Sequence, residues 1–190
     1  SEAILRDWVL KHPDRPEGFI QLGRVLSWDS KFQDAAGQYQ KGLELRPQDA
    51  TAHLELARIL SWIREHPRAL DEFRTALSLQ PDNLEAKRGV IQALIWNGEP
   101  VAARRELEDL RRKHPDDPQI NALQQELEAF DARQARAQAV SGPGAEQYLR
   151  ALVEKEPGNV DRRLELADVL LSRRDIPAAV RELREATALR

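Results

Sequence analysis

Four prolines recur at one constant interval, at Pro13, Pro47, Pro81 and Pro115. Between them a similar order of small and large apolar residues returns, so the chain repeats one plan instead of folding around a single central core. A fixed period of this length predicts an array of similar supersecondary units, in which each unit packs only against its neighbours. We therefore expect a stacked repeat protein.

The first complete unit shows the plan most clearly. Its first half contains Phe19-x-x-Leu22-Gly23-x-x-Leu26, and its second half contains Ala35-x-x-x-Tyr39 before Pro47. This arrangement resembles the tetratricopeptide repeat (TPR), a 34-residue pair of antiparallel helices. The resemblance implies an all-α fold, namely a right-handed TPR superhelix, or α-solenoid, of antiparallel helix pairs.

Counting from the repeat prolines divides the chain into a leading helix and five units. The segment 1–13 is predicted to be the second helix of a truncated repeat, because a proline ends it as Pro47 ends the first complete unit. The predicted units span 14–47, 48–81, 82–115, 116–157 and 158–190. In the third unit, Asn97-Gly98 is the expected helix stop, with the glycine in the left-handed conformation.

The fourth unit departs from the period, because the step from Pro115 to Pro157 is longer than the earlier ones. Its first helix has no stop signal before Val140, and Ser141-Gly142-Pro143-Gly144 is the strongest helix breaker in the chain. We predict a first helix extended by about two turns and followed by a Gly/Pro turn. A flexible hinge between two shorter arrays is the alternative, which we favour less because a continuous helix couples the parts that it joins.

The two ends of the sequence suggest that it comes from a larger protein. It starts at Ser1 without a methionine, and it stops at Arg190, where a closing proline would come next. Terminal repeats normally carry a polar capping helix, and none follows here. We therefore expect this segment to be part of a longer chain.

Composition argues against several classes of function. Acidic and basic residues nearly balance, with a net charge of −3, so no nucleic acid is expected as a partner. No apolar run is long enough to span a bilayer, so no direct membrane insertion is expected in this segment. The chain has no cysteine, and its four histidines lack metal-ligand spacing, so neither a metal site nor a cofactor is expected. Because no catalytic motif or catalytic residue can be identified, we predict that the chain is not an enzyme.

Three tryptophans share the interval of the repeat prolines: Trp28, Trp62 and Trp96 each end the first helix of a unit. Packing alone accounts for such recurrence, since a large ring can fill the space between adjacent units, and we prefer this interpretation. The alternative is a row of partly exposed rings that contact a ligand. Arg24 and Arg58 each precede a tryptophan by four residues, so their guanidinium groups could stack on the indoles.

The TPR resemblance also indicates where a ligand would bind. In that family the first helices line the concave face, and ligands usually lie there. Residues spaced by three or four positions share one face of a helix. The candidate partner-binding residues on this face are Arg24, Trp28, Leu54, Arg58, Trp62, Arg88, Gln92 and Trp96.

Two functions follow from resemblance. The TPR family implies a non-catalytic scaffold that binds a protein or peptide partner. The string Leu22-x-Arg24-x-Leu26-Ser27-Trp28, repeated at 56–62, is also similar to TPR segments of bacterial exopolysaccharide export proteins, which are periplasmic. That similarity implies contact with a polysaccharide or with its synthesis and export machinery. The compartment is therefore open between the periplasm and the cytoplasm.

Overall fold

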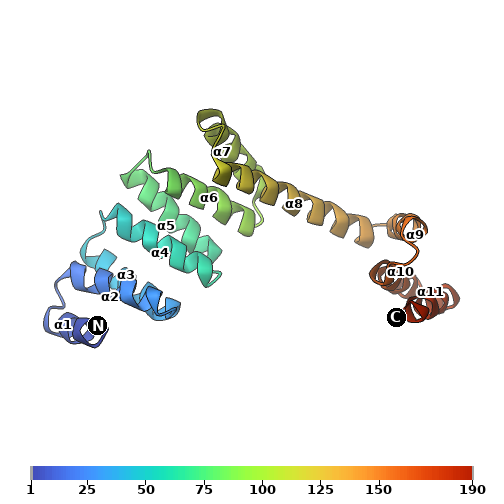
Figure 1. The fold of residues 1–190 in the computed structure, drawn as a ribbon, viewed down its shortest axis with the longest axis horizontal. Coiled ribbons are helices and arrows are strands. Elements are labelled where there is room, and N and C mark those ends of the chain that lie inside the picture. Colours follow the sequence, from blue (N-terminus) through green and yellow to red (C-terminus); the bar gives the residue numbers. More distant parts are fainter. Residues whose placement is uncertain (1, 190) are drawn as a thin grey trace. The chain divides into compact units, whose positions relative to one another are not determined.

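The computed structural model describes residues 2–189, and within them it contains eleven α-helices and no strand (Figure 1). The predicted all-α fold of antiparallel helix pairs is therefore confirmed. The helices are α1 (Glu2–Lys11), α2 (Pro16–Trp28), α3 (Phe32–Leu45), α4 (Ala50–Trp62), α5 (His66–Leu79), α6 (Leu84–Trp96), α7 (Pro100–Lys113), α8 (Pro118–Ser141), α9 (Ala145–Lys155), α10 (Val160–Ser172) and α11 (Ile176–Ala188).

Local sequence explains where many of these helices begin. Asp49, Asn83, Asn159 and Asp175 stand immediately before α4, α6, α10 and α11, and each side chain accepts a hydrogen bond from the amide three residues later. That bond satisfies an amide that has no partner within the helix. A proline occupies the first turn of α2, α5, α7 and α11, where a missing N–H costs little.

The turn inside each of the first three pairs uses one left-handed residue. Ser30, Arg64 and Gly98 occupy the same repeat position and have φ angles of 60°, 65° and 74°. The amide that follows each of them donates to a carbonyl five residues earlier, as Glu65 does to Leu60 at 2.9 Å. The left-handed glycine predicted at Gly98 is confirmed, whereas serine and arginine adopt the same conformation at a steric cost.

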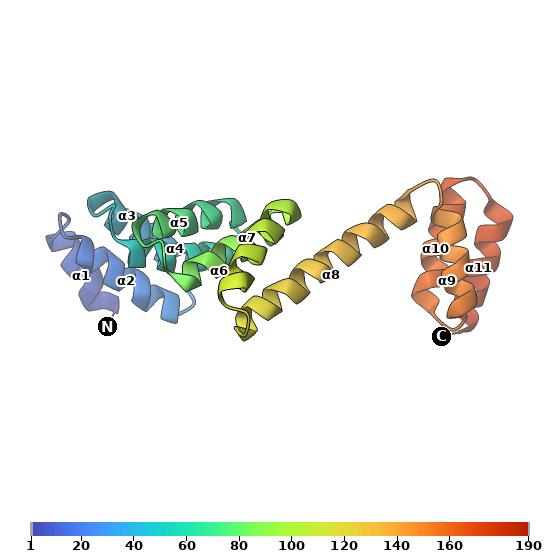
Figure 2. The same cartoon turned by 90° about the horizontal axis from the view of Figure 1, so that it is seen from above.

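The first of two compact units covers residues 2–128. In this unit α2 packs against α3, α4 against α5 and α6 against α7, while α3 contacts α4 and α5 contacts α6. Figures 1 and 2 show α2, α4 and α6 following one another along one side, with α3 and α5 along the other. Leu26, Leu60 and Leu94 occupy the same repeat position and are all buried, so one core position recurs in each pair of this unit.

A polar contact between paired helices occurs at equivalent repeat positions in both units. In α4, the His53 ring lies with Nδ1 2.5 Å from Glu72 of α5 and Nε2 3.0 Å from the Pro47 carbonyl oxygen. In α10, Arg163 contacts Glu182 of α11 at 2.9 Å and the carbonyl oxygen of the preceding repeat proline at 3.0 Å. The pairs α4–α5 and α10–α11 therefore follow one plan, although the chain between them breaks the repeat period.

The helix α8 runs across the boundary between the two units, which falls between Glu128 and Ala129. It ends at Ser141, and the turn that follows it leads into α9. The limits 116–157 for a fourth repeat stay a prediction. Among the described residues, no helix combines the length and the apolar character that crossing a lipid bilayer requires.

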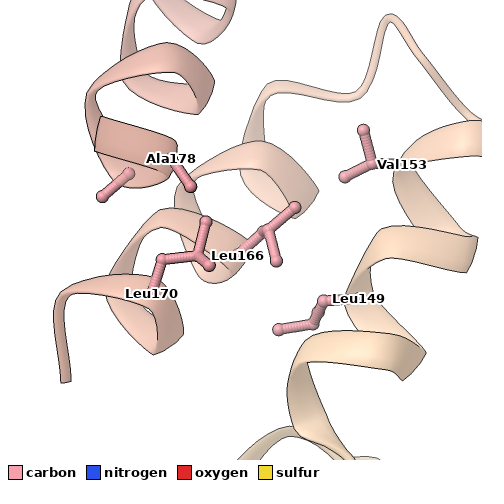
Figure 3. Close-up of a cluster of buried hydrophobic side chains, with 6 residues drawn as sticks. Leu149, Val153, Leu166, Leu170 and Ala178 are labelled. Atoms are coloured by element: carbon pink, nitrogen blue, oxygen red, sulfur yellow. The ribbon is translucent and has the colours of Figure 1, made fainter. Parts of the chain in front are cut away.

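The second compact unit begins at Ala129 and contains the end of α8 together with α9, α10 and α11. Its core lies where α9 and α11 meet α10. Figure 3 shows Leu149 and Val153 of α9 turned toward Leu166 and Leu170 of α10, with α11 closing the cluster through Ala178. These helices therefore bury apolar surface against one another within the second unit.

Candidate binding groove

Two adjoining pockets lie along the first helices of unit 2–128, and Arg58 of α4 lines both. The first pocket, of about 450 Å³, lies between α2 and α4. The second, of about 540 Å³, lies between α4, α6 and the start of α8. We call the two pockets together the groove. Six of the eight predicted binding residues line it: Arg24, Trp28, Arg58, Trp62, Arg88 and Gln92.

Three residues that line the first pocket form a polar network. Arg24 Nε of α2 lies 3.0 Å from both carboxylate oxygens of Glu55 in α4. The Tyr39 hydroxyl of α3 donates to the same carboxylate at 2.9 Å. Glu55 therefore joins α4 to both helices of the preceding pair, and its two oxygens are engaged within the chain.

The protonation states of this network follow from its surroundings. Burial raises the pKa of the Tyr39 phenol, so the hydroxyl keeps its proton and can donate. The hydrogen bond from Arg24 to Glu55 raises the pKa of the guanidinium, which stays positively charged. Hydrogen bonds in which both partners are charged are among the stronger ones in proteins.

The second pocket has an apolar floor and a polar rim. Its floor is formed by Phe73, Gly89, Ala122 and Leu123, and its rim by Arg58, Glu85, Arg88, Gln92, Gln119 and Glu126. Nε2 of Gln92 is buried and has no hydrogen-bond partner among the described residues. A buried donor without a partner costs about 1–3 kcal/mol, so this amide is suited to an acceptor that a ligand would bring.

Arginines along the groove are paired with acids of the next helix pair. Arg58 lies 3.3 Å from Glu85, and both side chains are about half exposed. Arg88 contacts Asp117 at 2.9 Å. Partial burial alone would raise the pKa of Asp117, but two backbone amides at the start of α8 and the Arg88 guanidinium hold it below its usual value. The groove thus carries both signs of charge in matched pairs.

Two of the three repeated tryptophans, Trp62 and Trp96, pack against the preceding helix pair, and all three remain exposed. Their side chains keep 79% (Trp28), 54% (Trp62) and 43% (Trp96) of their surface exposed. The ring of Trp62 lies 5.1 Å from Phe32, and the ring of Trp96 lies 4.8 Å from His66. Phe32 and His66 share one repeat position, and each begins the second helix of the preceding pair. Trp62 and Trp96 therefore combine packing with an exposed surface, and contact of these rings with a ligand stays a prediction.

Arginine stacks on tryptophan at only one of the two positions considered. Arg58 Cζ lies 5.8 Å from the centre of the Trp62 ring, so the contact expected there is confirmed. Arg24 is held by Glu55 instead, and no cation–π contact to Trp28 occurs among residues 2–189. The expectation for Arg24 is not met, because a carboxylate that accepts from a guanidinium competes strongly with an exposed ring.

The two remaining candidates do not line either pocket. Leu54 of α4 is buried and leaves little surface for a ligand. Trp96 donates its indole N–H to Glu126 at 2.9 Å, which ties the end of α6 to α8. Among the lining residues that the sequence reasoning missed are Tyr39, Glu55, Phe73 and Gly89. Tyr39 and Phe73 share one repeat position, as do Glu55 and Gly89, so the register of the repeat could have identified them.

His66, beside Trp96, provides a pH-sensitive contact in this series. Burial, with a smaller contribution from the charge of Arg64, lowers the pKa of His66 below its ordinary value. Since the folded pKa is depressed, the stability that this residue contributes is present above the unfolded pKa of about 6.5 and is lost as the pH falls through the folded pKa. We expect an NMR titration of the His66 ring to give a midpoint below 6.5, with the Trp96 indole signal moving at the same midpoint.

Removing the nearby charge supplies the control for that titration. In Arg64→Ala the His66 midpoint should rise only partway toward 6.5, because burial, the larger cause, remains. A midpoint at or above 6.5 in the unmodified chain would contradict this account of the His66–Trp96 contact.

The groove presents hydrogen-bond donors and acceptors, charged groups and ring edges to a ligand. Within residues 2–189, no group of three or more histidine, aspartate or glutamate side chains is placed to hold a metal ion. Its donors and acceptors come from three successive first helices and the start of α8, so a ligand that touches all of them would be extended.

Two family models match the chain, and both are described as tetratricopeptide repeat. They cover residues 20–61 and 64–127, which together make up more than half of the chain. The matched residues include all of α4 except Trp62, the whole of α5, α6 and α7, and most of the groove. No curated protein sequence matches the chain significantly.

Solved structures share the fold at low sequence identity. A tetratricopeptide repeat protein from Parabacteroides merdae is 17% identical, with a TM-score of 0.62 over 98% of this chain and 71% of its own. YrrB, described as a TPR protein with an unusual peptide-binding site, is 18% identical, with a TM-score of 0.55 over 100% of this chain and 94% of its own. The second TPR domain of human RPAP3, in complex with the HSP70 peptide SGPTIEEVD, is 18% identical, with a TM-score of 0.53 over 61% of this chain and 98% of its own. At these identities the likeness concerns the fold alone.

Proposed function

Since the chain belongs to the tetratricopeptide repeat family, we propose that it is a non-catalytic scaffold that binds an extended peptide segment of a partner protein along the groove. The single observation that supports this most is the pair of adjoining pockets that share Arg58, beside the exposed rings of Trp28 and Trp62. Aromatic and arginine side chains are the types that most often dominate binding energy at protein interfaces. Of the solved TPR structures, YrrB is described as having a peptide-binding site and the RPAP3 domain as a peptide complex, which agrees with this proposal.

The charges of the groove favour a peptide of mixed character over a strongly charged polymer. Arg24, Arg58 and Arg88 each have an acidic partner within the chain. A nucleic acid or a uniformly acidic ligand would find few unpaired cations here. A peptide can instead use individual donors and acceptors while its apolar side chains cover ring edges and the floor of the second pocket.

A polysaccharide is the second ligand class suggested by the sequence, and the ring packing disfavours it. Sugars bind tryptophan best when a face of the indole is open. Phe32 and Arg58 lie against the ring of Trp62, and His66 lies against that of Trp96. Only Trp28 has no such ring or cation neighbour among residues 2–189. The three tryptophans therefore do not form a row of rings with open faces on which sugars could stack.

A peptide library displayed on phage tests the proposal directly. Random dodecapeptides would be selected on the whole chain, and enriched sequences would be synthesised with a fluorescent label for anisotropy titrations. Because Arg58 lines both pockets, Arg58→Ala should weaken their binding more than about fivefold, the loss expected for a residue that contributes over about 1 kcal/mol. Its half-exposed pair with Glu85 contributes little to stability, so the fold should remain intact.

Arg112→Ala is the matched control, since Arg112 is an exposed arginine of α7 outside both pockets. It should leave peptide binding unchanged. Failure to enrich any peptide, or binding that Arg58→Ala does not weaken, would argue against the proposal. If acidic oligosaccharides bound and Arg58→Ala abolished that binding while no peptide was enriched, the polysaccharide function would replace it.

A further inference from the structure

The two pockets occupy equivalent places in successive helix pairs but are lined by different residues. Arg24 of α2 and Arg58 of α4 share one repeat position, and each faces the next first helix. In the first pocket the facing position holds Glu55, which accepts from Arg24 at 3.0 Å. In the second pocket the same position, one repeat later, is Gly89. The acid that engages the first arginine is therefore missing beside the second.

The aromatic partner of that acid has changed as well. Tyr39 donates its hydroxyl to Glu55, whereas Phe73, one repeat later, has no hydroxyl. A Cβ atom placed on Gly89 would lie 2.3 Å from the Phe73 ring, so this ring rests directly on the backbone of α6. At the repeat positions of Glu55 and Tyr39 the second pocket therefore has neither a carboxylate nor a hydroxyl, and an apolar floor lies there instead.

The equivalent donor on the next first helix, Gln92, also has no acid at the position that faces it. Gln92 of α6 shares the repeat position of Arg24 and Arg58, and its facing position on α8 is Leu123. Nε2 of Gln92 is buried without a partner among the described residues, which is an independent sign that an acceptor belongs in this pocket. Gln92 therefore lacks an oxygen acceptor that a ligand would supply, and Arg58, which lines the same pocket, can donate to the same acceptor.

We propose that the second pocket receives a glutamate side chain of the partner peptide, whose carboxylate accepts from Arg58 and Gln92 as Glu55 accepts from Arg24 in the first pocket. The two methylene groups of that side chain would lie on Phe73 and Gly89, and the carboxylate would reach the polar rim. This inference rests on the proposed peptide-binding function and names the chemistry that the groove selects.

Glu85 is the acid on the rim that competes for Arg58. Its carboxylate lies 3.3 Å from the Arg58 guanidinium, and the two side chains are 49% and 51% exposed. Such exposed pairs contribute little, so an incoming carboxylate can displace Glu85 at small cost. The other acid on the rim, Glu126, is already engaged by the Trp96 indole N–H at 2.9 Å.

The experiment uses the dodecapeptide library selected on the whole chain. Enriched peptides are expected to carry glutamate at one fixed position, and replacing it with glutamine in a synthetic peptide should weaken binding about tenfold, as loss of a charge-assisted hydrogen bond does. In the Gln92→Leu and Arg58→Ala variants, replacing the peptide glutamate with glutamine should weaken binding by a smaller factor. The reason is that each variant lacks one of the two side chains that donate to the carboxylate. This double comparison does not require the peptide to be known in advance.

Restoring the acid within the chain gives a second test. Gly89→Glu should place a carboxylate beside Arg58 and weaken peptide binding at least tenfold, while Gly37→Glu on α3, where a Cβ meets nothing within 4 Å, should not. Circular dichroism would confirm that Gly89→Glu folds; if Phe73 cannot move aside, the Gln92→Leu and Arg58→Ala comparison decides alone.

The possible failures are distinguishable. Enriched peptides whose binding Arg58→Ala weakens, but which lack a fixed glutamate or tolerate glutamine within twofold, would overturn this inference and leave the peptide-binding function standing. A library that yields no binding peptide would overturn the function itself, and the inference with it.

Discussion

Replacing Leu60 with alanine is expected to lower the free energy of unfolding of unit 2–128 by about 3 kcal/mol, within the range for buried leucines. Leu60 is completely buried in α4, the first helix of the middle pair, and has a helix pair on each side. A cavity there cannot collapse toward solvent, so the loss of packing adds to the loss of apolar burial. In a stack where each unit contacts only its neighbours, the middle pair also supports two interfaces.

Tryptophan fluorescence can report this change for the first unit alone. All four tryptophans of the chain lie within residues 2–128, so fluorescence-detected urea unfolding follows that unit. Leu10→Ala is the control, because Leu10 of α1 is 80% exposed and its truncation should change stability by less than about 0.5 kcal/mol. Similar losses for the two variants would contradict the assignment of Leu60 to a shared core.

Replacing Glu55 with alanine is expected to destabilise the same unit by about 2 kcal/mol. The reason is that the Tyr39 hydroxyl, which is almost fully buried, would lose the carboxylate to which it donates at 2.9 Å. Arg24 would lose its partner as well, but its side chain is 31% exposed and water can solvate part of it. An unsatisfied buried hydroxyl costs more than the exposed end of an arginine.

A double-mutant cycle separates these contributions. Tyr39→Phe alone should cost about 1 kcal/mol, whereas in the Glu55→Ala background it should cost nothing or stabilise, because the unsatisfied hydroxyl is removed. Glu85→Ala is the matched control: it breaks an acid–arginine pair between neighbouring helix pairs that is about half exposed, and should cost less than about 1 kcal/mol. Additive effects of the two substitutions would show that Tyr39 and Glu55 do not act together.

Much of the fold was predictable because its signals are local and repeated. The repeat prolines mark the ends of second helices, and Gly98 adopts the left-handed conformation that its place after Asn97 indicates. Ser30 and Arg64 adopt the same conformation without a glycine, and no local signal marks them. There the repeat geometry overrides residue preference, since the turn must have the same shape in every pair.

The candidate groove was only partly predictable. Helical spacing placed Arg24, Arg58 and Gln92 on one face, and all three line the pockets. It also placed Leu54 there, which is buried, because spacing along one helix cannot say how closely the next helix approaches. The partners of these residues come from neighbouring helices, so their identity depends on how one pair stacks on the next.

The sequence by itself determined that this protein is a stack of helix pairs, because one constant period in its apolar residues and prolines is incompatible with a single central core. Only the tertiary structure decided how each repeated position is used, since that depends on distances between helices that are far apart in sequence. At one repeat position it pairs Glu55 with Arg24 and Tyr39, and at the same position of the next repeat it leaves Gly89 beside an open pocket.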